Sequence, residues 1–599
     1  MSAQVAGRSL RFRFLAAAVA LLAGGAGLLA ATVAGGPAAQ ATARSSAAPA
    51  AWGVAQRIPD LDAIAAKGNL NCPADGNYCG GINIYALSCP APGDCTAGGD
   101  FYGQGQNDGT LGEGWVASES DGAWTAPKVI ELGQGGFPSY VAVTAVSCAS
   151  PGNCAAAGYD SEVVEATGYV DTYGAFVINE VNGKWSAPRQ IPGTDALNQT
   201  NYASASSVSC SAPGDCAVAG TVNGSQEFVA TETNGVWGTA ELVPGTHYGP
   251  GTDAGGGPGT PPVISCPKPG DCTLASGDTQ TGSVWSTSVA TETDGTWADA
   301  VPLPGYAAAG GVVTSLSCPA VGDCSAGGWT YSGKHTVPFV ASEVNGAWTS
   351  SALPGFAALS PASVDSGSLT ALSCGAPGNC SAGGIYRPAQ PEASAFLVSE
   401  VGGVWQTARP VPGLAKTERG ISLGQISCPA AGDCGAIADR AGVGYVLRQS
   451  GGTWAQARQV KGVTGPGRAW VISCAAPGIC VAGGNDHNIT EVWVLARSTA
   501  ATTLTTVSPA KSKVAYGAEG AQKITVTVQA TTPTPAGKVT VTANGKAVCT
   551  IALKNGTGSC RLAARQLKPG TYKAVATYRG AAPYQASSST VKTFKVAGS

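Results

Sequence analysis

The sequence predicts an all-β protein, in which an eight-bladed β-propeller is followed by a β-sandwich. Three observations predict it. A hairpin motif with two cysteines occurs eight times, a lone copy of the repeat's last strand opens the chain, and the composition changes after Thr499. At 599 residues the chain is too long for one ordinary hydrophobic core, so more than one structural unit is expected.

The repeat is built on a cysteine hairpin, of which Leu87–Cys95 is the clearest copy. An apolar strand ends in Ser-Cys, and a five-residue turn leads to a second Cys. Every copy has Gly two residues before the second Cys, and the Pro that precedes this Gly in six copies favours a type II turn. The two Cys then lie opposite each other, so we predict a disulfide in each hairpin. Their spacing does not match a zinc ribbon and the chain has only three His, so we predict no metal site.

All twenty Cys fall into local pairs. The predicted disulfides join Cys72 to Cys79, Cys89 to Cys95, Cys148 to Cys154, Cys210 to Cys216, Cys266 to Cys272, Cys318 to Cys324, Cys374 to Cys380, Cys428 to Cys434, Cys474 to Cys480 and Cys549 to Cys560. Such usage is typical of an oxidising compartment, because cytosolic thiols are kept reduced. The pair formed by Cys72 and Cys79 precedes the first full repeat, and we interpret it as a pinned loop or hairpin on that connection.

A second hairpin follows each of the first seven repeated Cys pairs. An Asn-Gly, Asp-Gly or Gly-Gly turn between apolar runs, as at Asn345-Gly346, predicts a type I′ turn. A Trp two residues beyond the turn then pairs with the residue two positions before it. The predicted pairs are Glu119 with Trp124, Glu180 with Trp185, Glu232 with Trp237, Glu292 with Trp297, Glu343 with Trp348, Glu400 with Trp405 and Gln449 with Trp454. A ring of Glu could bind a cation, but we expect each carboxylate to lie in water beside its Trp.

The two ends of the repeat region complement each other. Each repeat carries four strand signals, which is typical of a propeller blade. The eighth repeat stops after Leu495 without a Trp strand, while Trp52–Asp60 has the same Trp-to-Pro spacing as the segment that begins at Trp237. We therefore predict that residues 52–60 supply the fourth strand of the last blade, and that the propeller spans residues 52–498. A linear β-solenoid is the alternative, but it would have no use for such ends.

The predicted disc has two unlike faces. The cysteine turns and the Asn-Gly turns are short and fall on one face, whereas the strand 2–3 loops and the connections between blades vary in length and fall on the other. Variable loops on a rigid scaffold commonly carry binding sites, so we expect the ligand on the second face. The candidate carboxylates for catalysis are Asp160, Glu162, Glu165, Asp171 and Asp253, and the candidate aromatic residues for sugar stacking are Tyr102, Tyr173, Trp329 and Tyr386.

Composition and the N-terminus indicate where the protein works. Charged residues make up 12% of the chain and the net charge is −3, which argues against a nucleic-acid partner. Three arginines precede the apolar run Phe14–Ala34, so we predict a signal peptide over residues 1–43 and a flexible mature start over residues 44–51. An uncleaved membrane anchor is the alternative; no later segment is long and apolar enough to span a bilayer. We expect a secreted or cell-surface monomer that needs no cofactor.

The last hundred residues differ from the repeats. Alternating Thr and Val, as in Lys523–Val528, predict half-buried antiparallel strands and hence a sandwich. Cys549 and Cys560 flank an Asn-Gly turn, which predicts a hairpin with a cross-strand disulfide.

Residues 499–599 resemble a bacterial Ig-like repeat domain of secreted and surface proteins. The matching segments are Thr502–Thr505, Val514–Gly517, Pro535–Val541, Asn555–Cys560 and Pro569–Tyr578. The resemblance implies an Ig-like fold that acts as a stalk or spacer, sometimes as an adhesive module, and it supplies no catalytic residue.

The repeat region is similar in layout to secreted bacterial propellers. The turns Asp121–Trp124 and Asp294–Trp297 resemble the Asp-box of sialidase-like propellers, although the Asp-box has a residue between Asp and Gly that these turns lack. In that family the box is structural and lies far from the active site. The resemblance therefore implies a fold and no chemistry.

Two functions remain in view. The first is a non-enzymatic binding or adhesion protein, secreted or associated with the cell wall, that takes a glycan or a protein on its variable-loop face. The alternative is a sialidase-like glycan hydrolase, which requires two converging carboxylates, and no sequence feature pairs the candidates. No Ser–His–Asp set and no phosphate-binding loop is evident. We therefore expect binding rather than catalysis and assign no catalytic residue.

Overall fold

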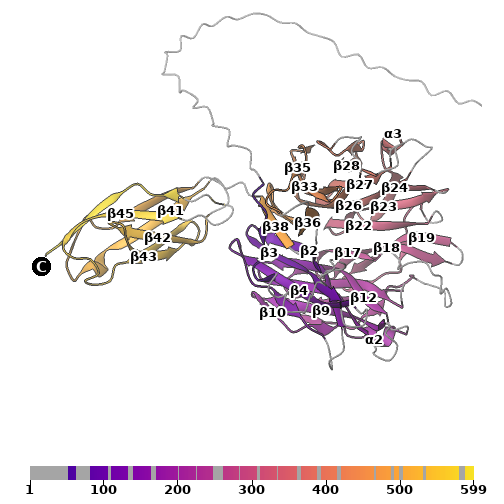
Figure 1. Ribbon diagram of the computed structural model, residues 1–599, viewed down its shortest axis with the longest axis horizontal. Helices are drawn as coiled ribbons and strands as arrows, with labels where there is room; N and C mark the ends of the chain where they lie inside the picture. The colour runs from indigo at the N-terminus through magenta and orange to yellow at the C-terminus, as the bar shows by residue number, and fades with distance from the viewer. Residues whose placement is uncertain are drawn as a thin grey trace, which may run out of the picture. The chain divides into compact units, whose positions relative to one another are not determined.

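The computed structural model describes residues 52–61, 81–497 and 503–598, apart from short internal gaps and the longer gap 247–260. The predicted signal peptide and residues 44–51 lie outside the described residues, and so do Cys72 and Cys79, whose predicted disulfide stays a prediction. Within the described part of the chain, no helix is long and apolar enough to cross a membrane. Figure 1 shows that the described chain is built almost entirely of strands.

The described residues of the range 52–497 form successive antiparallel sheets, in which most strands follow one another in chain order. A single parallel bridge, with Gly112 opposite Tyr140, joins the first two of these sheets at their edge. The first strands are β2 (Gly81–Ala91), β7 (Ser139–Ser150), β12 (Ala203–Ala212), β17 (Val263–Lys268), β22 (Gly311–Ala320), β26 (Gly367–Ala376), β31 (Ile421–Ala430) and β36 (Gly467–Ala476). The second strands are β3 (Asp94–Gln104), β8 (Asn153–Val163), β13 (Asp215–Val222), β18 (Asp271–Thr281), β23 (Asp323–Ser332), β27 (Asn379–Tyr386), β32 (Asp433–Arg440) and β37 (Ile479–Asp486). Each first and second strand together form one cysteine hairpin.

The outer half of each sheet is the predicted second hairpin. The third strands are β4 (Thr110–Ser120), β9 (Val170–Val181), β14 (Gln226–Thr233), β19 (Val284–Thr293), β24 (His335–Val344), β28 (Ser394–Val401), β33 (Val443–Ser450) and β38 (Val492–Arg497). The fourth strands begin at β5 (Ala123–Trp124), β10 (Lys184–Trp185), β15 (Val236–Trp237), β20 (Thr296–Trp297), β25 (Ala347–Ala352), β29 (Val404–Trp405) and β34 (Thr453–Trp454). In six sheets a further short strand continues along the same third strand: β6 (Lys128–Ile130), β11 (Arg189–Gln190), β16 (Glu241–Leu242), β21 (Val301–Pro302), β30 (Arg409–Pro410) and β35 (Arg458–Gln459). Two four-residue helices, α2 (Thr194–Leu197) and α3 (Phe356–Leu359), lie on connections between sheets.

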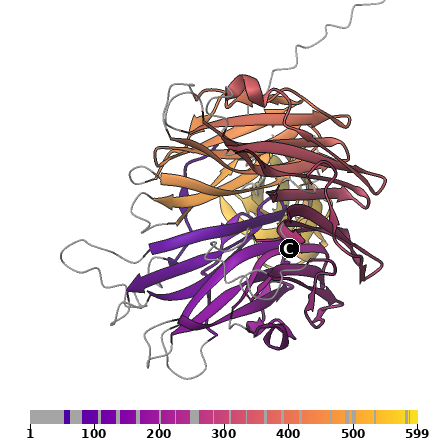
Figure 2. The same ribbon diagram turned by 90° about the vertical axis from the view of Figure 1, so that its right-hand side faces the viewer.

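The sheets are arranged as a β-propeller-like ring. Their first strands contact one another in a closed series, from β2 through β7, β12, β17, β22, β26, β31 and β36 back to β2. The first strands therefore form the inner wall of the ring, and the short fourth strands form its outer edge. Figure 2 shows the latest sheet, in orange, next to the earliest strands, in indigo.

The opening segment completes the last sheet. Strand β1 (Gln56–Arg57) pairs antiparallel with β38, with Gln56 opposite Val494. The amide of Gly53 donates to the carbonyl of Ala496 at 3.1 Å, and Trp52 packs against the core that contains Cys474. This is the pairing that the Trp-to-Pro spacing predicts.

The predicted cysteine hairpins are confirmed wherever both cysteines are described. In the ring, disulfides join Cys89 to Cys95, Cys148 to Cys154, Cys210 to Cys216, Cys266 to Cys272, Cys318 to Cys324, Cys374 to Cys380, Cys428 to Cys434 and Cys474 to Cys480. Each of these disulfides closes the turn between the first and second strands of its own sheet. They therefore hold single sheets together and do not join one sheet to another.

Short turns gather on one face of the ring, as predicted. Gly93 adopts φ 80°, as a type II turn requires, and its carbonyl accepts a 2.8 Å hydrogen bond from Gly122 of the Asp-Gly turn. The equivalent bonds run from the amide of Gly183 to Gly152, Gly235 to Gly214, Gly295 to Gly270, Gly346 to Gly322, Gly403 to Gly378 and Gly452 to Gly432. Each of the first seven sheets thus ties its two turns together.

A belt of serine side chains joins each sheet to the next. In every Ser-Cys motif the Ser Oγ accepts a hydrogen bond of 2.9–3.1 Å from the backbone amide of the first Cys in the following sheet. The bonds run from the amide of Cys148 to Ser88, Cys210 to Ser147, Cys266 to Ser209, Cys318 to Ser265, Cys374 to Ser317, Cys428 to Ser373, Cys474 to Ser427 and Cys89 to Ser473. The last bond joins the eighth motif to the first, so this serine belt is a closed circle.

Residues 503–598 form two sheets. One contains β39 (Leu504–Pro509), β41 (Lys523–Gln529) and β44 (Thr557–Arg561); the other contains β40 (Lys513–Ala515), β42 (Lys538–Ala543), β43 (Lys546–Ala552), β45 (Gly570–Tyr578), β46 (Ser587–Ser588) and β47 (Lys592–Ala597). A one-turn 3-10 helix, Glu519–Ala521, precedes β41. Their apolar faces share one core, which includes Ile524, Val541 and Phe594.

The disulfide between Cys549 and Cys560 forms, but its setting corrects a prediction. It does not cross a single hairpin: Cys549 lies on β43 and Cys560 on β44, which belong to different sheets. The Asn-Gly turn between them therefore carries the chain from one sheet to the other, and the disulfide links the two layers of the sandwich.

Replacing Ser473 by Ala tests the last bond of the serine belt. The variant leaves the half-buried amide of Cys89 without its acceptor, so we expect the free energy of unfolding to fall by about 1–2 kcal/mol. Denaturant unfolding followed by Trp fluorescence measures this change. Ser351→Ala, on the exposed edge strand β25, is the control and should change stability by less than about 0.5 kcal/mol. Equal effects of the two variants would contradict a closed belt.

Candidate functional site

The Glu–Trp pairs form as predicted, but the carboxylates are not in water. All seven pairs are in the predicted register. The glutamate belt, comprising Glu119, Glu180, Glu232, Glu292, Glu343, Glu400 and Gln449, is only 1–9% exposed. The expectation of solvated carboxylates was therefore wrong.

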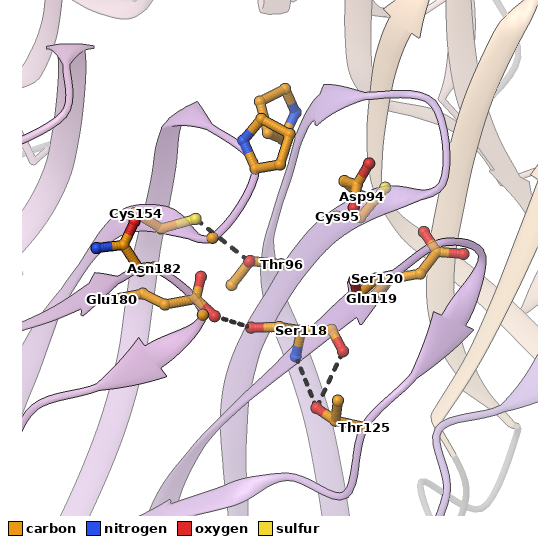
Figure 3. A pocket seen from close by; sticks show the side chains of 14 residues that line it. Asp94, Cys95, Thr96, Ser118, Glu119, Ser120, Thr125, Cys154, Glu180 and Asn182 are labelled. Carbon is orange, nitrogen blue, oxygen red and sulfur yellow. Dashed lines mark hydrogen bonds between the residues drawn. The ribbon is translucent and has the colours of Figure 1, made fainter. Parts of the chain in front are cut away.

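The reason is a donor in the preceding sheet. The residue just before each belt position is usually Ser, Thr or Asn. In four sheets its side chain donates a hydrogen bond to the belt glutamate of the next sheet. Ser118 Oγ donates to Glu180 Oε1 at 2.7 Å and accepts from Trp185 Nε1 at 3.1 Å, and Figure 3 shows the first of these bonds. The equivalent donors are Asn179 to Glu232, Thr231 to Glu292 and Ser342 to Glu400. The belt is thus a second set of bonds between sheets.

Pockets open between neighbouring sheets on this face. The one between the first two sheets, of about 330 Å³, is lined by Asp94, Glu119 and Glu180 (Figure 3). Among the described residues, no hydrogen-bond partner is found for the Oε2 atoms of Glu119 and Glu180. Burial raises the pKa of Glu119 to about 7, and the nearby charge of Asp94 adds to the effect. Ala496 occupies the donor position in the last sheet and offers no side-chain donor, so no hydrogen bond offsets this burial.

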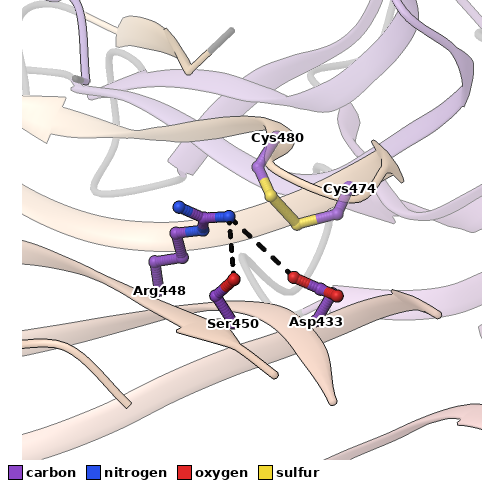
Figure 4. Close-up of polar contacts among 5 residues, drawn as sticks. All are labelled: Asp433, Arg448, Ser450, Cys474 and Cys480. Atoms are coloured by element: carbon purple, nitrogen blue, oxygen red, sulfur yellow. Dashed lines mark hydrogen bonds and ion pairs between the residues drawn. A yellow bond between two sulfur atoms is a disulfide. The ribbon is translucent and has the colours of Figure 1, made fainter. Parts of the chain in front are cut away.

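The seventh sheet departs from the pattern. Arg448 takes the donor position there, beside the disulfide between Cys474 and Cys480 of the eighth (Figure 4). Its Nη2 atom lies 3.9 Å from Asp433 Oδ1 and donates to Ser450 Oγ at 3.1 Å. A long, part-exposed ion pair of this kind contributes little stability.

The glutamate belt is structural, because its hydrogen bonds join neighbouring sheets, and we assign it no catalytic role.

Of the five carboxylates proposed for catalysis, the described residues include the side chain of Asp160 alone. Asp160 is half-buried on β8. Glu165, Asp253 and the side chains of Glu162 and Asp171 lie outside the described part of the structure. Among the described residues, no group of three His, Cys, Asp or Glu side chains could hold a metal ion.

The aromatic candidates have separate outcomes. Tyr386 is only 1% exposed and packs in a core with Phe356 and Phe396, and the Phe356 ring lies over Gly367 on the opposite strand. Its proposed role in stacking on sugars was wrong. Trp329 is half-buried and lies edge-to-face with the exposed Tyr331 at 5.1 Å, and Tyr102 is half-buried.

Tyr173, the remaining candidate, belongs to a larger feature. The tyrosine row consists of Tyr85, Tyr140, Tyr159, Tyr173 and Tyr202, from the first three sheets. Ring centroids are 5.9 Å apart for Tyr140–Tyr159, 6.2 Å for Tyr159–Tyr173 and 5.1 Å for Tyr173–Tyr202. Four of the rings are half-buried and Tyr85 is 41% exposed. Tyr140 and Tyr173 lie near the ends of β7 and β9 that are remote from the cysteine turns, and Tyr202 immediately precedes β12, so these three lie on the side of the variable loops. Tyr85 and Tyr159 lie within β2 and β8.

Asp100 organises one end of the row. Its side chain is fully buried; Oδ1 accepts from Asn83 Nδ2 at 2.8 Å, and Oδ2 accepts from the hydroxyls of Tyr85, at 3.2 Å, and Tyr140. Trp115 Nε1 donates to the carbonyls of Asn83 and Asp100, both at 3.1 Å, and so fixes the backbone beneath. One buried carboxylate thus holds tyrosines of two sheets in place.

Burial and a nearby charge raise the pKa of several tyrosines of the row. Burial, together with the charge of Asp100, raises the pKa of Tyr85, Tyr140 and Tyr159 above the usual tyrosine value. Burial also raises the pKa of Asp100, although the hydrogen bonds from Tyr140, Asn83 and Tyr85 oppose it. The row presents aromatic rings and hydroxyl groups, which suit a ligand with both apolar faces and hydroxyl groups.

Comparison with known protein families supports the fold of the C-terminal part. Residues 499–597 match the family Bacterial Ig-like domain (group 3). This match confirms the fold that the resemblance implies for the C-terminal part. No curated protein matches the sequence.

Among solved structures, the chain is similar to Sqt1 from Chaetomium thermophilum, at 15% identity and a TM-score of 0.40 over 69% of this chain and 95% of that chain. It is also similar to the β-propeller domain of Cps50 (Swd1) from Myceliophteria thermophila, at 10% identity and a TM-score of 0.33 over 69% and 99% of the two chains. A third is the α-L-arabinanase of Penicillium chrysogenum, at 9% identity and a TM-score of 0.28 over 49% and 92%. Scores this low carry no functional argument.

Glu119 should make stability depend on pH. Its folded pKa of about 7 lies above the ordinary Glu value, so the folded state binds the proton more tightly between about pH 4.5 and 7. As pH rises through that window, ionisation of Glu119 should therefore lower the free energy of unfolding of the wild type by on the order of 2–3 kcal/mol. Glu119→Gln should lack that loss when unfolding is measured at several pH values. Glu241→Gln, at an exposed Glu, is the control; parallel pH profiles for wild type and Glu119→Gln would contradict the account.

Proposed function

We propose that this chain is a non-enzymatic binding protein that takes a glycan on the tyrosine row. The observation that carries the proposal is the row itself: five tyrosines from three sheets, held in part by the buried carboxylate of Asp100. Sugars present apolar C–H faces and hydroxyl edges, and tyrosine offers the matching ring face and hydroxyl.

The position of the row supports binding on the variable-loop side. Four of its five tyrosines lie on strands of a hydrogen-bonded ring of sheets, and Tyr202 immediately precedes β12. The row is therefore ordered before a ligand arrives, and a pre-organised site loses less entropy on binding. A row of three or more rings also suits an extended ligand better than a single small molecule.

A hydrolase finds less support. Glycoside hydrolysis needs two carboxylates that face each other about 5–10 Å apart. In the described residues, Asp100 is engaged by Asn83 and two tyrosines, and no second carboxylate hydrogen-bonds to that cluster. The sialidase-like alternative would require a pair contributed by loop residues such as Asp171 and Asp253.

The rest of the chain fits the same role in this proposal. The ring is an eight-bladed propeller over residues 52–498, and residues 499–599 act as a spacer. The protein is exported through the signal peptide predicted over residues 1–43 and works as a secreted or cell-surface monomer. Nine disulfides support an oxidising environment.

Binding to a glycan array, followed by affinity measurements on the best ligand, tests the proposal. Tyr159→Ala and Tyr173→Ala should each weaken binding about tenfold or more, because each removes a central ring of the row. Tyr331→Ala, an exposed tyrosine outside the row, is the control and should bind as wild type does. Unchanged binding by folded Tyr159→Ala and Tyr173→Ala would contradict the proposal, and so would release of new reducing ends from the bound glycan.

A further inference from the structure

One position of the repeat differs sharply among the eight inner strands. It lies four residues before the first Cys of each motif. In seven of the eight sheets this residue lies at a β-bulge of the first strand, and in the fourth sheet it precedes the first strand. The residues there are Tyr85, Thr144, Ser206, Pro262, Thr314, Thr370, Gly424 and Trp470. Six of the eight are small, and the two large aromatic residues belong to the first and last sheets.

The small hydroxyl residues have a clear structural role. Thr144 Oγ1 donates to the carbonyl of Ala205 in the next sheet at 2.8 Å, and Thr370 Oγ1 donates to that of Leu423 at 3.0 Å. Ser206 and Thr314 make the equivalent bonds. At this position the repeat therefore uses a short side chain to join neighbouring sheets along the inner wall.

Tyr85 and Trp470 cannot take that role. Tyr85 is 41% and Trp470 45% exposed, which makes them two of the most exposed large aromatic residues in the described chain. Their strands, β2 and β36, are in contact where the ring closes. The inner wall thus presents an exposed aromatic residue on each side of the closure, in continuity with the tyrosine row that begins at Tyr85.

A cation lies at the same place. The Arg468 guanidinium carbon is 5.8 Å from the centre of the Trp470 ring, and the Arg side chain is exposed. No ion pair of Arg468 is found among the described residues. The half-buried carboxylate of Asp439 accepts a hydrogen bond from the amide of Gly442; burial raises its pKa, and the charge of Arg468 opposes that shift. A guanidinium stacked on an indole keeps its N–H groups directed outward, in the fork that matches a carboxylate.

We propose that Arg468, Trp470 and Tyr85 form a subsite for an acidic sugar, which rests on the proposed glycan-binding function. Arg468 binds the sugar carboxylate, and the two aromatic rings bind the apolar faces of that residue and its neighbour. A neutral ligand would leave the charge of the guanidinium unmatched, and a cationic one would be repelled by it. The subsite gives the tyrosine row a preference for uronic-acid glycans.

The test compares two oligosaccharides that differ only in charge: an oligogalacturonate and the corresponding neutral oligogalactose. The wild type should bind the acidic form more tightly, with a preference that falls as salt rises. Arg468→Gln should lose about tenfold in affinity for the acidic ligand and nothing for the neutral one. Trp470→Ala should weaken both. Arg458→Gln, which removes an exposed charge from the outer strand β35, is the matched control and should leave both affinities unchanged.

The outcomes separate the two proposals. Equal wild-type affinity for both ligands, or wild-type behaviour of Arg468→Gln, overturns the acidic-sugar subsite, while a loss of binding in Tyr159→Ala would still support the tyrosine row. Failure of the wild type to bind either ligand overturns the subsite, and the glycan array then decides the proposed function on its own. Intrinsic fluorescence, compared between the wild type and Trp470→Ala, shows whether the ligand reaches the inner wall.

Discussion

The hydrogen bond between a serine hydroxyl and the amide of the next sheet's cysteine is the interaction on which the ring depends. A β-sheet cannot satisfy the amides of its own inner edge strand, and here each inner strand presents one to its neighbour. The Ser-Cys dipeptide supplies both an acceptor and a donor. Its serine Oγ accepts a hydrogen bond from the following sheet, and its cysteine amide donates one to the serine of the preceding sheet. The last pair, Ser473 and Cys89, makes the same hydrogen bond, so the first and last sheets join in the same way as any other two neighbours.

Departures from the repeat concentrate where the ring closes. Ala496 replaces a donor there, which leaves Glu119 buried and without a hydrogen bond from the last sheet, and Trp470 and Tyr85 replace hydroxyl residues on the inner wall. The first departure weakens a structural belt, while the second exposes aromatic surface beside Arg468. A repeat protein tolerates such changes at a few positions because the remaining junctions keep the ring together. In this account, specificity arises at those positions.

Local features of the sequence predicted most of the fold. The cysteine turns, the Asn-Gly turns and the Glu–Trp register each depend on residues close together in the chain, and all three are confirmed in the described residues. The strand from Trp52 was predictable because it is a copy of a repeated element. The burial of Glu180 was not, because its donor, Ser118, lies 62 residues earlier in another sheet. The link that Cys549 and Cys560 make between two sheets was missed for a similar reason: the same Asn-Gly signal serves a hairpin and a change of sheet.

The tyrosine row shows the limit of such reasoning for function. Its members occupy different positions in three repeats, so no spacing connects them, and sequence analysis selected only Tyr173. Tyr386 was selected on the same grounds and lies in the core with Phe356 and Phe396. Whether a tyrosine faces solvent depends on the residue opposite it in the sheet and on the neighbouring sheet. Only the assembled ring shows which tyrosines meet.

Amide hydrogen exchange at the first cysteine of each motif measures ring closure most directly. If the serine belt is a closed circle, the amide of Cys89 should be protected to the same degree as that of Cys148 and the six amides that follow. Rapid exchange at Cys89 alone, with the other seven amides protected, would mean that the first and last sheets do not join, and would contradict the account.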